Sequence, residues 1–420
     1  MTALATHDPL RSALEIREQL SSDKRRVAFF MGAGTSMAVG LPGIDELTSS
    51  VAKRLGAKEK KSFEAVRAEM SGSPNIEAVL NRIRLCRELL AENANKTVDG
   101  LSAVTASELD VAICRAICDI VSVDPPKGLK THAILAQWLH ALHRHRERPV
   151  EIFTTNYDLL FERAMEDVGL PFFDGFVGAV APFFAPESVE GDGTEQNASV
   201  HPPRCWTRLW KLHGSIGWQM RKDSLSGRAR ITRTGNCRPS DGDELIIFPS
   251  RDKYSDSRKL PFIAYQDRLR RFLMNGEALF VLLGYSFSDQ HLNDIIFQGL
   301  RSNTRLAVCA FMHGVKTKGK DALSLPEDVV GYGTAHRNLS IFGPDRAVIG
   351  GVVGAWCEPS RKPKAGDEWP FWHDIEKRFT LGDFTAMTGF LERFIGFDPA
   401  SKPAAAKDDL TKAPRPEANP

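Results

Sequence analysis

The chain has 420 residues, more than the ~100 to 200 of a typical domain, so we expect one large domain with insertions or two domains. Its 55 basic and 53 acidic residues leave almost no net charge, which gives no support to nucleic acid or a membrane surface as a partner. No stretch approaches the ~18 apolar residues that span a bilayer, and the N-terminus lacks a secretion-signal pattern, so we expect a cytoplasmic protein. The seven cysteines are an odd number in a long chain, which favours reduced and mostly buried thiols.

The first predicted elements are a helix and a strand. Apolar residues at helical spacing predict an amphipathic helix at about 9–22, and the apolar run 26–31 (RVAFFM) predicts a parallel strand that is buried on both faces. The charged and helix-prone stretch 51–148 predicts a helical insertion. The next strand is predicted at 150–154 (VEIFT), and a helical pattern follows it at 158–168.

The same alternation continues in the second half of the chain. Residues 181–203 are rich in glycine, proline and acidic residues and predict a loop. Further strands are predicted at 210–214, 245–249, 279–284 and 306–312. Strands that alternate with helices predict an α/β fold with a Rossmann-like, doubly wound parallel sheet. The predicted divisions are an N-terminal helix (1–23), the core (24–312), a helical C-terminal accessory region (313–397) and a disordered tail (398–420).

The turns at the strand ends are the candidate site, because ligands of open parallel sheets lie beyond the carboxyl ends of the strands. In the turn Gly32-Ala33-Gly34-Thr35-Ser36 the glycines let backbone N–H groups approach a diphosphate, although Met37 occupies the place of the third glycine in a full G-x-G-x-x-G. The turn 154–158 (TTNYD) brings hydroxyl, amide and carboxylate groups together. An alternative role for its Asn156 and Asp158 is to cap the following helix.

Two later turns complete the set. His213 lies beside the flexible Gly214, although a lone histidine is more often structural than catalytic. The segment 284–289 (GYSFSD) has the glycine and hydroxyls of a cradle for phosphate or ribose, and Ser288 or Asp289 has the alternative role of a helix cap.

Taken in order, GAGTS with a downstream GLP, then TTNYD, KLHG and GYS, this chain resembles the sirtuin family from about Val27 to Ile296. The resemblance implies NAD as substrate, with Asn156, His213 and Asp158 as the catalytic residues. In it Asn156 holds the nicotinamide ribose or an attacking water, Asp158 orients the nicotinamide side and His213 is the base. The remaining residues that it implies for NAD binding are Gly32, Ala33, Gly34, Thr35, Ser36, Leu41, Pro42, Thr154, Gly284, Ser286 and Asp289.

The sequence also distinguishes among sirtuin-like proteins. Protein-deacylating sirtuins carry a four-cysteine zinc module after the histidine, whereas this chain has only Cys237 and Cys309 between Gly214 and Phe311, so no zinc or other metal is expected. His140, His143 and His145 lie in or beside a basic run and are better interpreted as a solvated helix end. The chain resembles zinc-free bacterial antiphage NADases, which hydrolyse NAD to nicotinamide and ADP-ribose and cause abortive infection.

Other functions and partners stay open. A protein deacylase or an ADP-ribosyltransferase would use the same NAD pocket, and a third possibility is a non-catalytic NAD or ADP-ribose sensor. The resemblance implies control by a homo-oligomer or by a companion defence protein, such as a HerA-like ATPase, a short Argonaute or another phage sensor. The helices of 51–145 and the aromatic-rich segment 369–397 are candidate assembly surfaces, and ordinary core packing is the alternative for both.

Overall fold

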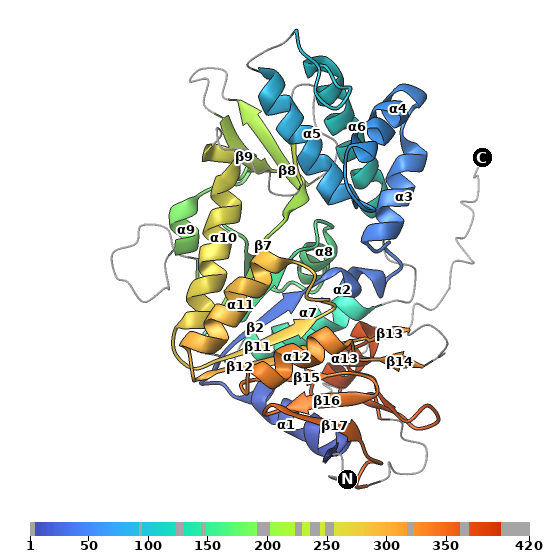
Figure 1. The fold of residues 1–420 in the computed structure, drawn as a ribbon. Coiled ribbons are helices and arrows are strands. Elements are labelled where there is room, and N and C mark those ends of the chain that lie inside the picture. The colour runs from blue at the N-terminus through green and yellow to red at the C-terminus, as the bar shows by residue number, and fades with distance from the viewer. Residues whose placement is uncertain are drawn as a thin grey trace, which may run out of the picture.

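The computed structural model describes residues 5–91, 95–122, 124, 130–143, 146, 148–190, 202–222, 229–235, 244–247, 256–316, 322–361 and 369–395. Its central feature is a ten-stranded sheet (Figure 1). The strands follow one another in the order β1 (Ala5–His7), β17 (Val352–Trp356), β16 (Arg346–Ile349), β15 (Leu339–Phe342), β12 (Leu306–Phe311), β11 (Ala278–Leu283), β2 (Arg26–Met31), β3 (Glu151–Thr154), β7 (Thr207–Lys211) and β4 (Phe172–Phe173). All neighbours from β15 to β4 are parallel, as predicted.

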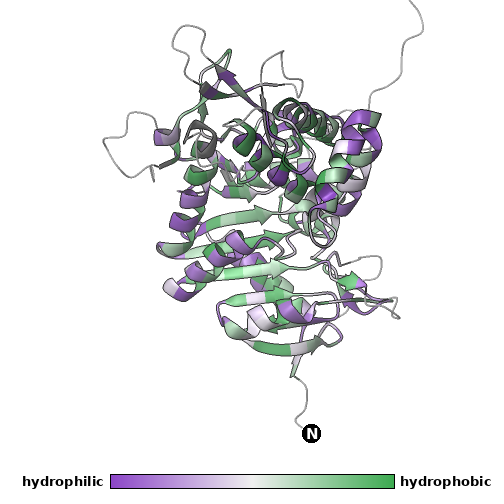
Figure 2. Cartoon of the chain, turned by 45° about the horizontal axis from the view of Figure 1, so that its top comes forward, coloured by the Kyte–Doolittle hydropathy of each residue, from purple (hydrophilic) through white to green (hydrophobic). Residues whose placement is uncertain are grey.

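Helices cover both faces of this sheet, which confirms the doubly wound α/β architecture. The central strands are mostly apolar and almost fully buried, as Figure 2 shows by their largely hydrophobic colouring. One face packs against helices α1 (Pro9–Ser21), α7 (Thr131–His143), α8 (Leu160–Asp167) and α13 (Phe384–Glu392). The opposite face packs against α10 (Asp256–Met274), α11 (Gln290–Ser302) and α12 (Glu327–Ala335).

A separate group of helices, which we call the helical unit, has its own hydrophobic core. It consists of α3 (Ile44–Arg54), α4 (Ala57–Ala68), α5 (Ile76–Ala91) and α6 (Ala103–Val121). Within it the buried Asp110 carboxylate accepts hydrogen bonds from Arg84 and Arg87, so its charge is compensated. The described residues of 51–148 are mostly helical, as predicted, but α7 packs against the main sheet and not in this unit.

A second sheet, of five strands, lies beside the main one. Its strands are β10 (Glu244–Ile247), β8 (Gly214–Lys222), β9 (Ala229–Arg233), β6 (Phe183–Phe184) and β5 (Phe176–Val177), and all of them pair antiparallel. The strand predicted at 245–249 therefore exists as β10 but lies outside the parallel sheet. The predicted loop at 181–203 contains β6 and the short helix α9 (Pro186–Glu190), and its residues 191–201 lie outside the described residues.

The C-terminal region was predicted to be helical and is a mixture of helices and strands. It contains the helices α12 and α13, as predicted, and also several strands that were not predicted. The strands β15, β16 and β17 extend the main sheet, and short hairpins are formed by β13 (Val315–Lys316) with β14 (Leu323–Ser324) and by β18 (Trp372–His373) with β19 (Arg378–Phe379). Gly350 and Gly351 both have positive φ, the conformation that a two-residue hairpin turn requires, so β16 folds back onto β17. The predicted tail at 398–420 lies outside the described residues. Among the helices of the described residues, none is long and apolar enough to cross a membrane.

Candidate functional site

Neighbouring strands of the main sheet end at one level. Leu283 of β11 pairs with Met31 of β2, Met31 pairs with Thr154 of β3, and Thr154 pairs with Lys211 of β7. The turns that follow these residues therefore lie side by side. The order of strands also reverses here, because β3 and β7 lie on one side of β2 while β11 and β12 lie on the other. Such a reversal is where dinucleotides bind in doubly wound sheets.

The two glycine turns that flank the reversal touch through their backbones. A Cβ on Gly32 would lie 2.4 Å from the carbonyl oxygen of Gly284, and a Cβ on Gly34 would lie 2.7 Å from its Cα. The Gly34 N–H donates to the Gly284 carbonyl at 3.0 Å, and the Gly32 N–H donates to the Leu283 carbonyl at 2.9 Å. Glycine is needed at these positions for the two turns to meet. The N–H groups of Gly32 and Gly34 therefore bond to carbonyls of the protein. In a typical diphosphate-binding turn, such N–H groups bond to the phosphate oxygens instead.

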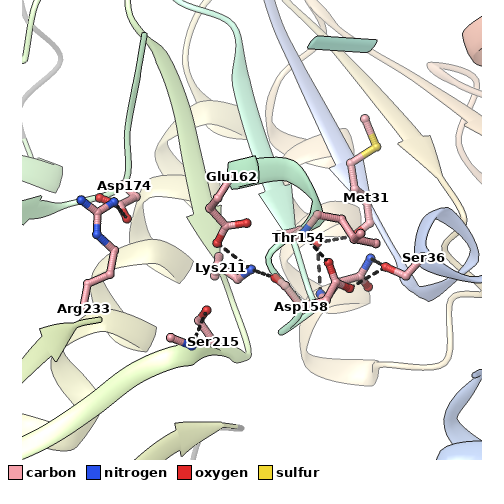
Figure 3. Close-up of polar contacts among 12 residues, drawn as sticks. Met31, Ser36, Thr154, Asp158, Glu162, Asp174, Lys211, Ser215 and Arg233 are labelled. Carbon is pink, nitrogen blue, oxygen red and sulfur yellow. Dashed lines mark hydrogen bonds and ion pairs between the residues drawn. The ribbon is translucent and has the colours of Figure 1, made fainter. Parts of the chain in front are cut away.

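Asn156 links the first two turns. Its Nδ2 lies 3.0 Å from the Gly32 carbonyl oxygen and 2.8 Å from Ser36 Oγ, and Ser36 Oγ donates to Asp158 Oδ2 at 2.6 Å. Ser36 belongs to the short helix α2 (Ala33–Met37) and faces Asp158 across the turns (Figure 3). Asp158 also accepts from the Leu160 N–H at 3.0 Å, so it contacts the start of α8, although the N-cap position itself is Leu159. The capping alternative therefore holds in part for Asp158, whereas Asn156 bonds to the Gly32–Ser36 turn instead.

Lys211 holds the turn 154–158 in place. Its Nζ donates to the Asp158 carbonyl oxygen and to Glu162 Oε1, the latter at 2.9 Å (Figure 3). Only 2% of the Lys211 side chain is exposed. Burial raises the pKa of Glu162, and the charge of Lys211 lowers it in part. Sequence reasoning did not single out Lys211, although a lysine inside the buried run LWKL was a usable signal.

His213 lies between two carboxylates. Its Nε2 is 3.1 Å from Asp289 Oδ2, and its Nδ1 is 3.9 Å from Glu77 Oε1. Burial alone would raise the pKa of Asp289, but the hydrogen bond and charge of His213 lower it below its ordinary value. Asp289 also accepts from the Leu292 N–H and so caps α11. Asp289 therefore both contacts His213 and caps α11, so the two roles predicted for it are compatible.

Glu77 is a site residue that sequence reasoning missed. It comes from α5 of the helical unit, and its Oε1 also accepts a hydrogen bond from the Tyr157 hydroxyl at 3.2 Å. Burial raises the pKa of Glu77, while His213 and Tyr157 lower it in part. No feature of the sequence pairs position 77 with position 213, so only the tertiary structure could reveal this contact.

The other predicted NAD-binding residues differ in exposure. Thr35 and Thr154 have no exposed surface: Thr35 Oγ1 donates to the Gly32 carbonyl and Thr154 Oγ1 to the Met31 carbonyl. The structure thus gives these threonines a role in holding the turns, and direct contact with a ligand stays a prediction. Ala33 and Ser286 are exposed, Leu41 is buried, and Pro42 and Gly284 are half-buried.

A cavity of about 630 Å³ adjoins the strand-end turns. Its described lining residues do not include Asn156 or His213, so it lies next to the candidate chemical centre and does not contain it. The residues that line it are Leu159, Glu162, Arg163, Glu166, Ala179, Val180, Ala181, Pro182, Ser215, Trp218, Arg221, Arg233, Thr234 and Gly235.

No group of three or more potential metal ligands occurs among the residues that the structure describes. Cys86, Cys114, Cys118 and Cys309 are buried and not in disulfides, as expected, whereas Cys205 is exposed. Cys237 and His145 lie outside the described residues. The absence of zinc stays a prediction.

Comparison with known proteins supports the sirtuin resemblance. A SIR2-like domain model matches residues 150–325, which include β3, β7, His213 and the turn after β11. The match begins after β2, so it does not include the Gly32–Ser36 turn. This turn belongs to the site because β2 lies between β3 and β11 in the sheet. No curated protein matches the chain. The SIR2-like domain points to an enzyme that uses NAD and supports a place for this chain among sirtuin-like proteins.

Proposed function

We propose that this chain hydrolyses NAD to nicotinamide and ADP-ribose, as an NADase of bacterial antiviral defence that causes abortive infection. One observation carries the proposal. Asn156 and His213 each lie two residues beyond the paired strand ends of Thr154 and Lys211, at the point where the strand order reverses. An amide and an imidazole are thereby held at the level where a dinucleotide binds.

The chemistry needs little from the protein. The oxygen of a water molecule attacks the anomeric carbon of the nicotinamide ribose, and the bond from that carbon to the nicotinamide nitrogen breaks. The electron pair of the broken bond stays on the nicotinamide, whose cationic ring becomes neutral, so no acid has to protonate the leaving group. The proton of the water passes to the imidazole of His213, which acts as the general base.

The surrounding contacts assign roles to the other residues. The Nδ2 of Asn156 is used by Gly32 and Ser36, which leaves its Oδ1 to accept a hydrogen bond from the water or a ribose hydroxyl. Asp158 fixes Ser36, and Asp289 fixes His213. The exposed Ala33 and Ser286 are suitably placed to approach the phosphates and the adenosine half of NAD.

The proposal includes control of the activity, because an unregulated NADase would harm its own cell. We propose a homo-oligomer, a companion defence protein such as a HerA-like ATPase or a short Argonaute, or both. The helical unit supports this, since it has a core of its own and projects from the main sheet (Figure 1). The protein would act in the cytoplasm and without zinc.

The test is to incubate the purified protein with NAD, alone and with the product of the neighbouring gene, and to follow nicotinamide and ADP-ribose. Asn156→Ala and His213→Ala should each abolish nicotinamide release while NAD binding persists. The control is His7→Ala, on the edge strand β1, which should retain full activity. Nicotinamide release that needs an acylated peptide or another acceptor would instead support deacylation or ADP-ribosyl transfer. NAD binding without cleavage under every condition would support a sensor.

A further inference from the structure

The helical unit reaches the candidate chemical centre through one side chain. Glu77 lies in the first turn of α5, and its Oε1 is 3.9 Å from His213 Nδ1. On the other side of the ring, Asp289 Oδ2 is 3.1 Å from Nε2. The imidazole is therefore held between a carboxylate of the α/β core and a carboxylate of the helical unit.

Glu77 is itself fixed in place. The Tyr157 hydroxyl donates to its Oε1 at 3.2 Å, and Tyr157 belongs to the same turn as Asn156. The start of α5 is tied to α3, because the Ile76 N–H donates to Thr48 Oγ1 at 2.9 Å. Ile76 is fully buried in the core of the helical unit. A rigid anchor of this kind allows a carboxylate to orient a neighbouring ring.

The helical unit is also packed against the chain that follows His213. Ile216 is fully buried in the core of the helical unit, and its N–H donates to the Tyr157 carbonyl at 2.9 Å. A shift of the helical unit relative to the α/β core would therefore change the distance between Glu77 and His213. The position of this unit and the geometry of the imidazole are mechanically linked.

We propose that Glu77 is a positioning residue for His213, so that the helical unit is part of the chemical centre as well as a candidate assembly surface. The inference rests on the proposed hydrolysis of NAD for its kinetic consequence only. When His213 accepts a proton from water, the imidazolium lies between two carboxylates, which stabilises that charge as it develops. A partner that displaced α5 would act on the same contact.

The direct test is nuclear magnetic resonance of the ring nitrogens and ring protons of His213, assigned with His213→Ala. Glu77→Gln keeps the size of the side chain and removes its charge, so it should shift these signals. Glu108→Gln is the matched control, because it removes a carboxylate of the same helical unit whose partner is the exposed Lys58. Unchanged His213 signals in Glu77→Gln would overturn the inference, whether or not the protein cleaves NAD.

The kinetic test uses nicotinamide release. Glu77→Gln should lower kcat about 10- to 100-fold with little change in KM, since misplacement of a catalytic group affects the chemical step more than binding. Tyr157→Phe, which keeps the buried ring and removes the donor to Glu77, should lower kcat by a smaller factor and have no further effect in Glu77→Gln. Equal kcat in Glu77→Gln and Glu108→Gln would overturn the inference and leave the proposed hydrolysis standing. A wild-type protein that never releases nicotinamide would refute the hydrolysis, and the resonance test would still decide the role of Glu77.

Discussion

The contact between the two glycine turns gives the sharpest prediction about the architecture of the site. Gly284 has φ +64°, and a Cβ there would lie 2.6 Å from the Thr35 nitrogen and 2.9 Å from the Gly34 carbonyl carbon. The left-handed conformation costs a non-glycine residue about 1 to 2 kcal/mol. Forcing a methyl group against fixed backbone atoms costs a further ~1 to 3 kcal/mol. We therefore expect Gly284→Ala to lower the free energy of unfolding by about 2 to 5 kcal/mol.

The assay is urea unfolding followed by intrinsic fluorescence, together with a calorimetric titration of NAD. Gly284→Ala should also weaken NAD binding, because relief of the clash separates the two turns at the point where the strand order reverses. Gly331→Ala is the control, since a Cβ at this helical position meets nothing within 4 Å and alanine favours a helix by about 1 kcal/mol. If Gly284→Ala unfolds at the same urea concentration as the wild type and binds NAD equally well, the close approach of the turns does not exist in solution.

Asn156→Asp replaces the amide donor by an acceptor-only carboxylate that faces the Gly32 carbonyl oxygen, so nicotinamide release should fall ~100-fold or more. Activity near the wild-type level would contradict the role of the amide. Burial would raise the pKa of Asp110, but the charges of Arg84 and Arg87 hold this pKa below its ordinary value. The ionised carboxylate therefore stabilises the folded protein above pH ~4, and this stabilisation is lost as the pH falls through the lower pKa of the folded state. Asp110→Asn should therefore destabilise the helical unit by about 3 to 5 kcal/mol at pH 7, and by less as the pH drops towards 3, when unfolding is followed by circular dichroism. Burial raises the pKa of the Cys309 thiol to about 12. Iodoacetamide at pH 8 should therefore alkylate the exposed Cys205 much faster than Cys309, as measured by peptide mass spectrometry. Equal rates at the two cysteines would contradict the burial of Cys309.

Much of the central sheet could be predicted from local composition. The largely apolar runs at 26–31, 150–154, 279–284 and 306–312 are strands close to the predicted bounds, because a strand buried on both faces consists mostly of apolar residues. The C-terminal region could not be predicted in the same way. Its aromatic side chains suit helices and hairpins equally, and the pairing of β16 with β17 depends on the turn at Gly350 and Gly351, which sequence reasoning did not single out.

The sequence by itself determined which turns follow the central strands and which polar side chains they carry, because short-range composition fixes both strand ends and glycine turns. Only the tertiary structure decided how these turns are arranged. The alignment of Met31, Thr154 and Lys211 in one row is a matter of register, and register arises from packing between strands that are distant in the chain. The same holds for Glu77, which approaches His213 across 136 positions of sequence because Ile216, three residues after His213, is buried in the core of the helical unit.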